Sequence, residues 1–278
     1  MKLSVSCRIA EGFLSKKEAI MNLAELCDLA SKAGYEGLCM RASQIGIHSA
    51  DEEIRQAVEI IRDRDLKVTM VSGDFDIVYN NENGPNCLRN ITPYLKLAET
   101  LGAGLIRVCI KTEDDLRVAQ RAADEAIERN VTLVHQCHVQ SLFETLDQIE
   151  TGLRTINRPN FGLIYEAANL EECRQDYGVA SIQRLAPWIK NVYLQNQALN
   201  PKGAVTLETW THGPISFDII DIPESGGLRF SEIIAGLKQV DYQGYLTVHQ
   251  SAPEDGSNPT RSAANTARYL RDLMSSNP

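Results

Sequence analysis

Short apolar runs alternate with longer amphipathic stretches along the whole chain. The short runs predict buried strands, and the longer stretches have the periodicity of helices that cover an apolar core with one face. The predicted strands are Leu3–Cys7, Gly34–Arg41, Leu66–Gly73, Leu105–Ile110, Val131–His138, Phe161–Glu166, Ile189–Asn196 and Gly244–Gln250. The predicted helices are Lys16–Lys32, Ala50–Arg64, Asn86–Leu101, Glu113–Arg129, Leu142–Thr155, Leu170–Pro187, Phe230–Val240 and Thr260–Met274.

This alternation of strands and helices is typical of a parallel sheet with right-handed crossovers. Eight such units over about 250 residues is the expected size of a closed (β/α)₈ barrel. An open doubly wound sheet usually carries a glycine-rich phosphate turn after its first strand, and Cys7–Gly12 contains none. No linker or low-complexity stretch divides the chain. We therefore predict an α/β fold, a (β/α)₈ TIM barrel, forming a single domain over residues 1–278.

Composition narrows the choice of partners. The chain has 28 Lys+Arg and 37 Asp+Glu, a net charge of −9, which disfavours nucleic acids and anionic membranes. Its seven cysteines show no CxxC spacing and lie in apolar segments, so we expect reduced, buried thiols. No apolar run reaches membrane-spanning length, and the first residues lack the layout of a signal peptide. These features predict a cytoplasmic protein.

Polar side chains collect where the predicted strands end, and in a TIM barrel this C-terminal end carries the active site. Strands five to eight end in His135–His138, Glu166–Asn169, Tyr193–Asn196 and His249–Gln250. The ends of the earlier strands add Arg41, His48, Ser72, Asp74, Arg107 and Lys111. Burying so many polar groups without partners would cost several kcal/mol, so their joint placement indicates a binding or catalytic site.

Each of these residues alone also has an ordinary structural explanation. His135 and Gln136 are consecutive in a strand and point to opposite faces, so we expect His135 to pack against the helices. Glu166 precedes the helical segment AANLEE and is placed to cap it. Arg107 lies in mid-strand, where we expect it to bond neighbouring polar groups inside the barrel. His249 is a candidate for a hydrogen-bonded core imidazole.

Four stretches, VTLVHQCHVQSLFET, NFGLIYEAANL, IKNVYLQN and GYLTVHQ, resemble the motif strands of the xylose isomerase-like superfamily of sugar isomerases and epimerases. In that superfamily the strands read Glu-x-His, Asp-x-x-His/Asn, a His segment and a terminal Gly-Tyr-x-x-x-Glu. LASKAGYEGLCMR and AETLGAGLIRV resemble its second and fourth strands with their preceding helices. The resemblance extends from about Leu3 to about Arg271.

The resemblance implies a divalent metal site whose ligands have all changed identity here. The four ligand positions fall on Gln136, Glu166, Tyr193 (with Gln195 on the same strand face) and His249. The metal ligands that follow are Glu166, His249, Gln136 and Gln195. Such a mixture favours Zn²⁺, Mn²⁺, Co²⁺ or Fe²⁺ over Mg²⁺. A metal-free site is the alternative, with Glu166 and His249 as catalytic base and acid.

The resemblance also implies a mechanism and a substrate class. The superfamily moves a proton between two glutamates through an enediolate, and Gln136 cannot accept a proton in this way. We expect an isomerase or epimerase that transfers a proton next to the carbonyl of an unphosphorylated sugar or keto-sugar. The alternatives are a lyase or dehydratase acting on a keto-sugar or keto-cyclitol, and a sugar-binding barrel without catalysis. The predicted substrate-binding residues are His138, Asn169, Arg107, Lys111, His48 and Asn196.

Two further expectations concern partners and loops. The superfamily's DNA-repair branch needs many ligands for three zinc ions, which five histidines and a negative net charge disfavour. We therefore expect a small carbohydrate as the partner, together with homo-oligomerisation, which is common in the superfamily. The segment from Gln197 to Gly227 is longer than an ordinary loop. Trp210 and His212 in it are candidates either to cover a sugar or to lie on an exposed excursion.

Overall fold

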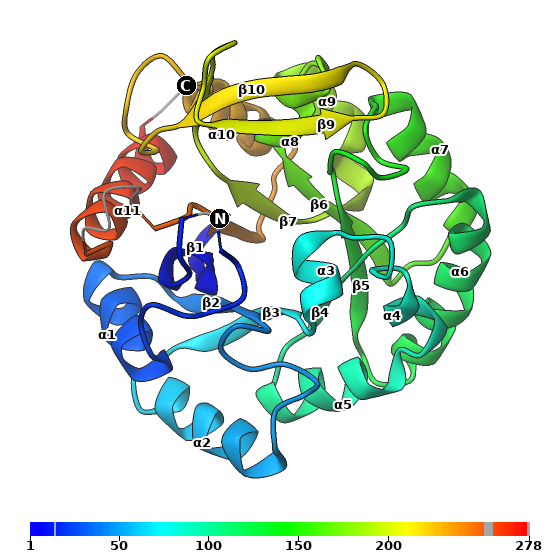
Figure 1. Cartoon of the computed structure of the whole chain (residues 1–278), viewed down its shortest axis with the longest axis vertical. Helices are drawn as coiled ribbons and strands as arrows, with labels where there is room; N and C mark the ends of the chain where they lie inside the picture. Colours follow the sequence, from blue (N-terminus) through cyan, green and yellow to red (C-terminus); the bar gives the residue numbers. More distant parts are fainter. Residues whose placement is uncertain (14, 253–257, 277–278) are drawn as a thin grey trace.

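The computed structural model describes residues 1–13, 15–252 and 258–276. Eight parallel strands form a closed barrel in the order β1-β11-β7-β6-β5-β4-β3-β2, so the first and last strands are hydrogen-bonded neighbours (Figure 1). The strands are β1 (Lys2–Ser6), β2 (Gly37–Arg41), β3 (Lys67–Ser72), β4 (Leu105–Val108), β5 (Thr132–Gln136), β6 (Phe161–Glu166), β7 (Ile189–Leu194) and β11 (Tyr245–Val248). The predicted (β/α)₈ fold is confirmed.

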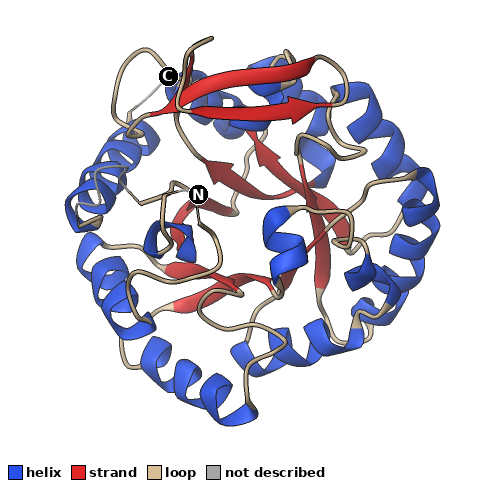
Figure 2. Cartoon of the chain, in the orientation of Figure 1, coloured by secondary structure: helices blue, strands red, loops and turns tan. Residues whose placement is uncertain are grey.

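Helices surround the barrel as an outer ring, as Figure 2 shows with helices in blue around strands in red. The main helices are α1 (Leu23–Ala33), α2 (Asp51–Arg62), α5 (Thr92–Leu101), α6 (Glu113–Ile127), α7 (Leu146–Ile156), α9 (Val179–Leu185), α10 (Phe230–Gln239) and α11 (Thr260–Ser275). Short helical turns follow several strands: η1 (Cys7–Ala10), α3 (Phe75–Tyr79), α4 (Asn86–Arg89), α8 (Ala167–Glu172) and η2 (Ala186–Trp188). None of the described helices has the length and apolar character needed to cross a membrane.

The first helix is shorter than its sequence pattern predicts. It was expected over Lys16–Lys32 but begins only at Leu23, because Asn22 and Glu25 form a capping box. In that box the Asn22 side chain accepts from the Glu25 amide at 3.0 Å, and the Glu25 carboxylate accepts from the Asn22 amide at 3.0 Å. Lys16 therefore belongs to the loop between β1 and α1 rather than to a helix.

Two other predicted helices are each divided in the structure. The helix expected over Asn86–Leu101 becomes α4 and α5, because Asn90 takes a non-helical backbone (φ −142°, ψ 77°) and Pro93 favours a new start. The segment from Leu170 to Pro187 is divided between α8, α9 and η2. Both interruptions shorten the helices without changing the order of units around the barrel.

The long segment after β7 folds into a small antiparallel sheet rather than a loop. Its strands β8 (Gln197–Leu199), β9 (Val205–Thr209) and β10 (Gly213–Ile219) pair in the order β8-β10-β9, and β9 and β10 form a hairpin at the edge of the barrel (Figure 1, yellow). The buried Glu144 carboxylate fixes the turn of this hairpin, because it accepts the backbone amides of Trp210 at 2.7 Å and Thr211 at 2.9 Å.

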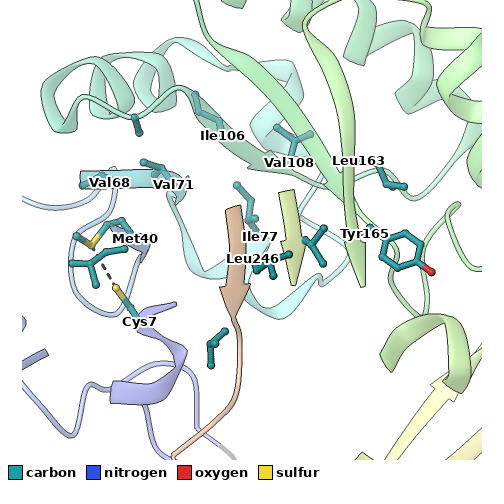
Figure 3. Close-up of a cluster of buried hydrophobic side chains, with 14 of the residues drawn as sticks. Cys7, Met40, Val68, Val71, Ile77, Ile106, Val108, Leu163, Tyr165 and Leu246 are labelled. Carbon is teal, nitrogen blue, oxygen red and sulfur yellow. Dashed lines mark hydrogen bonds between the residues drawn. The ribbon is translucent and has the colours of Figure 1, made fainter. Parts of the chain in front are cut away.

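The core has two parts, one on each side of the strands. Outward-facing side chains such as Val71, Ile106 and Leu163 belong to the large cluster that includes the helices (Figure 3). The barrel itself is filled by a layer made of Cys39, Met70, Val134, Ile164 and Tyr193, with Leu105 against it. All seven cysteines are buried free thiols, as predicted.

Candidate active site

Strand alternation aims one set of polar side chains into the C-terminal mouth of the barrel. Cys39, Val134 and Ile164 belong to the interior layer. Residues two positions further along each strand point the same way. Those residues are Arg41, Gln136 and Glu166, and the same alternation from Leu105 places Arg107 inside the barrel. The mouth of the barrel is therefore lined by charged and amide side chains from β2, β4, β5 and β6.

Glu166 is the buried carboxylate of this mouth. Its Oε2 atom accepts hydrogen bonds from the side-chain amides of Gln136 and Asn169. Burial raises the pKa of Glu166 to about 7, against the opposing effects of the Gln136 hydrogen bond, the Arg107 charge, the Asn169 hydrogen bond and the Lys16 charge. Near neutral pH this side chain can both accept and return a proton.

His249 lies against the same interior layer. Its ring stacks on Tyr193 with centroids 4.0 Å apart and an interplanar angle of 6°. The Tyr193 hydroxyl in turn lies 3.2 Å from the Cys39 thiol. Burial, reinforced by the charges of Arg41 and Arg107, lowers the pKa of His249 well below its usual range, so the imidazole is neutral at pH 7. Its Nδ1 atom is buried without a hydrogen-bond partner.

One buried ion pair lies at the edge of the mouth, and its two charges compensate each other. Arg41 donates to the two carboxylate oxygens of Glu11 at 2.7 and 3.0 Å, and the Ser43 hydroxyl donates to Glu11 at 2.6 Å. Arg8 lies 3.7 Å from the same carboxylate. Two arginines thus compensate the negative charge of Glu11. Sequence reasoning missed Glu11 and Arg8, which lie in the segment after β1 rather than at a strand end.

Two cations of the mouth lack such a partner. Arg107 is only 2% exposed and makes no hydrogen bond or ion pair with any described residue, so the expectation that it bonds polar neighbours is wrong. Lys16 is half-buried with its Nζ atom 5.9 Å from the Tyr79 ring centre. Burial and the charges of Arg41, Arg8 and Arg107 lower its pKa to about 7. The sequence pattern places Lys16 in a helix over Lys16–Lys32, and it therefore gives no indication that this lysine reaches the mouth of the barrel.

Two predicted substrate-binding residues, His138 and Asn169, lie in the segments that follow β5 and β6. Asn169 donates to Glu166, and its side-chain oxygen accepts from the Val139 amide at 3.1 Å, which fixes the loop after β5. His138 is half-buried, with Nδ1 lying 2.8 Å from the Val139 carbonyl and 3.1 Å from the Asn80 amide nitrogen. The structure therefore brings Gln136 and Asn169 to the Glu166 carboxylate, while His138 is linked to Asn169 through Val139.

Three other predicted substrate-binding residues have different surroundings. Lys111 donates to the Gln140 carbonyl at 2.7 Å and lies under the Trp210 ring at 5.7 Å. His48 is exposed and stacks on Phe75. Asn196 uses its whole amide on the backbone: its oxygen accepts from two amides and its nitrogen donates to three carbonyls, none of them in the mouth (Gln197 and Leu228; Asp221, Ile222 and Glu224).

Four more side chains for which the sequence gives an expectation lie outside this group. His135 packs outward as expected, with Nδ1 3.0 Å from the Val108 carbonyl and its ring against Phe143. Gln195 is half-buried and has one long contact, 3.5 Å, to Gln197. Trp210 and His212 are exposed, which fits the alternative of a surface excursion better than that of a substrate cover.

The comparisons with known proteins identify the family. A family model described as "Xylose isomerase-like TIM barrel" matches residues 27–273. The chain belongs to the xylose isomerase-like TIM barrel family. No curated protein sequence matches it.

Several solved structures share the barrel over nearly the whole of both chains. The probable 3-DHS dehydratase AsbF of Bacillus anthracis is 17% identical, with a TM-score of 0.69 and coverage of 98% of this chain and 99% of the other. D-allulose 3-epimerase of Methylomonas sp. is 13% identical, with a TM-score of 0.70 and 98% of both chains covered. The IolI protein with a bound zinc atom is 16% identical, with a TM-score of 0.72 and coverage of 99% and 98%.

The donor set of this family member suits a divalent cation poorly. Among residues 1–13, 15–252 and 258–276, no three His, Cys, Asp or Glu side chains lie together as metal ligands would. Of the ligands suggested by the resemblance, only Glu166 is a carboxylate, and it is already held by two amides. Arg107, Arg41 and Lys16 place positive charge where a metal would add more. We therefore derive no step through a metal.

Proposed function

We propose that this family member is an enzyme that transfers a proton next to the carbonyl of a small carbohydrate, with Glu166 as the base, and that it acts as an isomerase or epimerase. One observation carries the proposal: a buried carboxylate at the C-terminal end of the barrel has a pKa raised to about 7. Perturbed carboxylates in such a position are matched to proton transfer near neutral pH. A D-allulose 3-epimerase and a probable 3-DHS dehydratase are among the proteins that share this barrel, which supports the choice.

In the proposed reaction Glu166 removes the proton bound to the carbon beside the carbonyl. The electron pair moves onto the carbonyl oxygen, and the positive charge of Lys16 stabilises the resulting enediolate. Glu166 then returns the proton to the neighbouring carbon. The amides of Gln136 and Asn169 hold the carboxylate in place throughout. For isomerisation a single base suffices, because both transfers to and from carbon take place on one face of the enediolate, while the hydroxyl proton of the neighbouring carbon passes to the former carbonyl oxygen. Epimerisation additionally requires a second acid that protonates the opposite face.

A lyase is the second candidate, and one observation favours it. Lys16, with a pKa of about 7, can donate a proton to a departing hydroxyl group while Glu166 acts as the base. Product NMR in D₂O separates the two reactions, since deuterium in a rearranged sugar indicates an isomerase and loss of water indicates a dehydratase. Binding of sugars without deuterium exchange or turnover would contradict both and favour a binding protein.

We expect the activity to survive removal of divalent metals. Protein purified without chelators should contain well below one equivalent of Zn, Mn, Co, Fe or Mg by elemental analysis, and EDTA treatment should leave turnover within about twofold. The physical reason is the surplus of positive charge around the single carboxylate. Stoichiometric metal, or activity lost with EDTA and restored by one of these ions, would contradict this proposal.

The pH profile should report the ionisation of Glu166. A base must be ionised to accept a proton, so kcat/KM should rise with pH through about 7 and level off above it. Gln136 and Asn169 act on the pKa of this carboxylate through hydrogen bonds. The charged groups that act on it are Arg107, Lys16 and Glu172. The profile is measured on the free enzyme at low substrate concentration.

A variant of Gln136 tests whether that profile belongs to Glu166. The Gln136 hydrogen bond lowers the pKa of Glu166, so Gln136→Leu should move the rise in kcat/KM to higher pH. Gln120→Leu is the control, because this half-buried side chain of α6 donates to the Thr155 carbonyl of α7, and it should leave the profile unchanged. A profile that does not move in Gln136→Leu would assign the titration to another group, Lys16 being the next candidate.

A further inference from the structure

The charges in the mouth of the barrel do not balance. Arg8, Lys16, Arg41 and Arg107 all act on the same few titratable groups, so they lie close together. Against these basic groups, of which Lys16 is only partly charged at pH 7, stand three carboxyl groups. Arg41 and Arg8 already compensate Glu11, Glu166 is only partly ionised at pH 7, and burial raises the pKa of Glu172 well above its usual range. The molecule as a whole carries a net charge of −9, so this surplus is local and opposite in sign to the rest.

Arg107 is the most informative of the four. Its side chain is almost fully buried, its Nε atom has no hydrogen-bond partner, and no carboxylate among the described residues lies within 4.0 Å. A buried guanidinium without a counter-ion is unfavourable by several kcal/mol. Glu166 does not serve as the counter-ion of Arg107. Its Oε2 atom accepts hydrogen bonds from Gln136 and Asn169 instead. The missing partner is therefore a group that arrives with the ligand.

We propose that the substrate of this site carries a carboxylate, which the Arg107 guanidinium binds while Glu166 removes the proton next to the carbonyl. This inference rests on the proposed function and narrows its substrate class. The substrate is then a sugar acid or a carboxylated keto-cyclitol rather than a neutral sugar. Lys16, in the loop after β1, faces the same charge from the open side of the mouth.

A carboxylate fits this position better than a phosphate. The guanidinium presents parallel N–H groups that match the two coplanar oxygens of a carboxylate. Phosphate sites in barrels usually use backbone amides of a loop and a helix N-terminus near the last strands. Here the chain after β7 leads directly into β8, and Arg107 belongs to β4 rather than to the last strands. Arg107 thus offers one planar fork inside the barrel and no surrounding ring of amides.

The test uses matched pairs of compounds. Uronates, keto-aldonates and carboxylated keto-cyclitols are each compared with the aldose, ketose or keto-cyclitol that lacks the carboxylate, by deuterium exchange in D₂O and by saturation-transfer NMR for binding. The wild-type protein should prefer the acid of an active pair by at least about 100-fold in kcat/KM. Arg107→Met should raise KM for that acid by about 10- to 100-fold, as expected for losing a charge-assisted bidentate contact.

Further variants keep the result interpretable. Arg107→Lys retains the positive charge but lacks the planar guanidinium with its paired N–H groups. It should show a smaller increase in KM than Arg107→Met. Arg117→Met removes an exposed arginine of α6 and should behave like the wild type. Thermal unfolding of Arg107→Met should match or exceed that of the wild type, because the variant removes an unpaired buried cation. This measurement separates loss of binding from loss of folding.

Different outcomes contradict different claims. Exchange that is equal or faster with the neutral member of each pair would overturn the carboxylate while leaving the proposed function intact. Acid-selective binding that requires Arg107, but without any exchange, would support the carboxylate subsite and contradict the proposed function. Binding that is indifferent to the carboxylate or to Arg107 would overturn this inference, as would inorganic phosphate competing more strongly than malonate.

Discussion

Replacing Glu166 with glutamine is expected to reduce turnover by about 10²- to 10⁴-fold while making the folded protein more stable above pH 7. Glutamine has the same shape and can still accept the hydrogen bonds of Gln136 and Asn169, but it cannot take a proton from carbon. The loss should therefore appear in kcat, with little change in KM. Steady-state kinetics with the best substrate of the D₂O screen measures this effect.

The gain in stability follows from the direction of the pKa shift. The pKa of Glu166 is about 7 when folded and near 4.5 when unfolded, so the folded state binds more protons between these values. Stability from this group is fully present below pH 4.5 and is lost as pH rises through 7. The wild type thus loses up to about 3 kcal/mol over that interval through Glu166, and Glu166→Gln does not. Urea unfolding at pH 5 and pH 8 measures the difference.

A neighbouring glutamate provides the control for this pair of effects. Glu171 lies on α8, the short helix that follows Glu166, is partly buried and also has a raised pKa, but its side chain accepts a hydrogen bond from Gln197 and is influenced by the charge of Arg229. Glu171→Gln should keep wild-type turnover. If Glu166→Gln retained more than about a tenth of the wild-type rate, Glu166 would not be the base. If both variants lost activity equally, the effect would be one of packing around α8.

Replacing Arg41 with methionine is expected to lower the free energy of unfolding by about 3–5 kcal/mol. Arg41 and Glu11 form a fully buried, bidentate pair, and removing one partner leaves the other charge buried without compensation. Arg8, 3.7 Å from Glu11, replaces only part of the lost interaction. For a chain of this size the change corresponds to a fall in melting temperature of roughly 6 to 20 °C.

Two comparisons show whether burial is the cause. Arg55→Met removes the arginine of an exposed pair with Glu52, whose side chains are both 63% exposed, and should cost less than about 1 kcal/mol. The double variant Arg41→Met/Glu11→Leu replaces the whole pair with apolar groups and should recover most of the stability. A double variant as unstable as Arg41→Met alone would show that the packing of these side chains, rather than the unpaired charge, dominates.

The sequence predicts the barrel well because the relevant information is local. Apolar runs and amphipathic stretches repeat eight times, and each boundary error has a local cause, such as the Asn22–Glu25 capping box or Pro93. Strand alternation also places Gln136 and Glu166 at the mouth of the barrel, and it separates His135 from them. These positions follow from the period of a strand and from the family motifs, without knowledge of tertiary contacts.

The charge pattern of the mouth could not be read in the same way. Lys16, Glu11 and Arg8 reach it through a loop whose path depends on contacts with other parts of the chain, such as the hydrogen bond from the Lys16 amide to Tyr79. Whether a polar side chain already has hydrogen-bond partners within the protein also depends on tertiary contacts. Asn196 and Arg107 both lie near the ends of predicted strands. The Asn196 side chain uses both its amide oxygen and its amide nitrogen in hydrogen bonds, whereas the Arg107 side chain makes none with the described residues.

The pairing of β1 with β11 has a consequence for how the protein is made. The ring closes between the first strand and the last, in a register that places Lys2 beside Tyr245 and Val5 beside Val248. Until β11 emerges from the ribosome, Arg41, Arg107 and Glu166 face an open sheet and remain hydrated. Burial of these charges, and with it the raised pKa of the carboxylate, therefore requires β11 as well as the strands before it. His249, which follows β11 directly, stacks on Tyr193 of β7 only when this strand is in place.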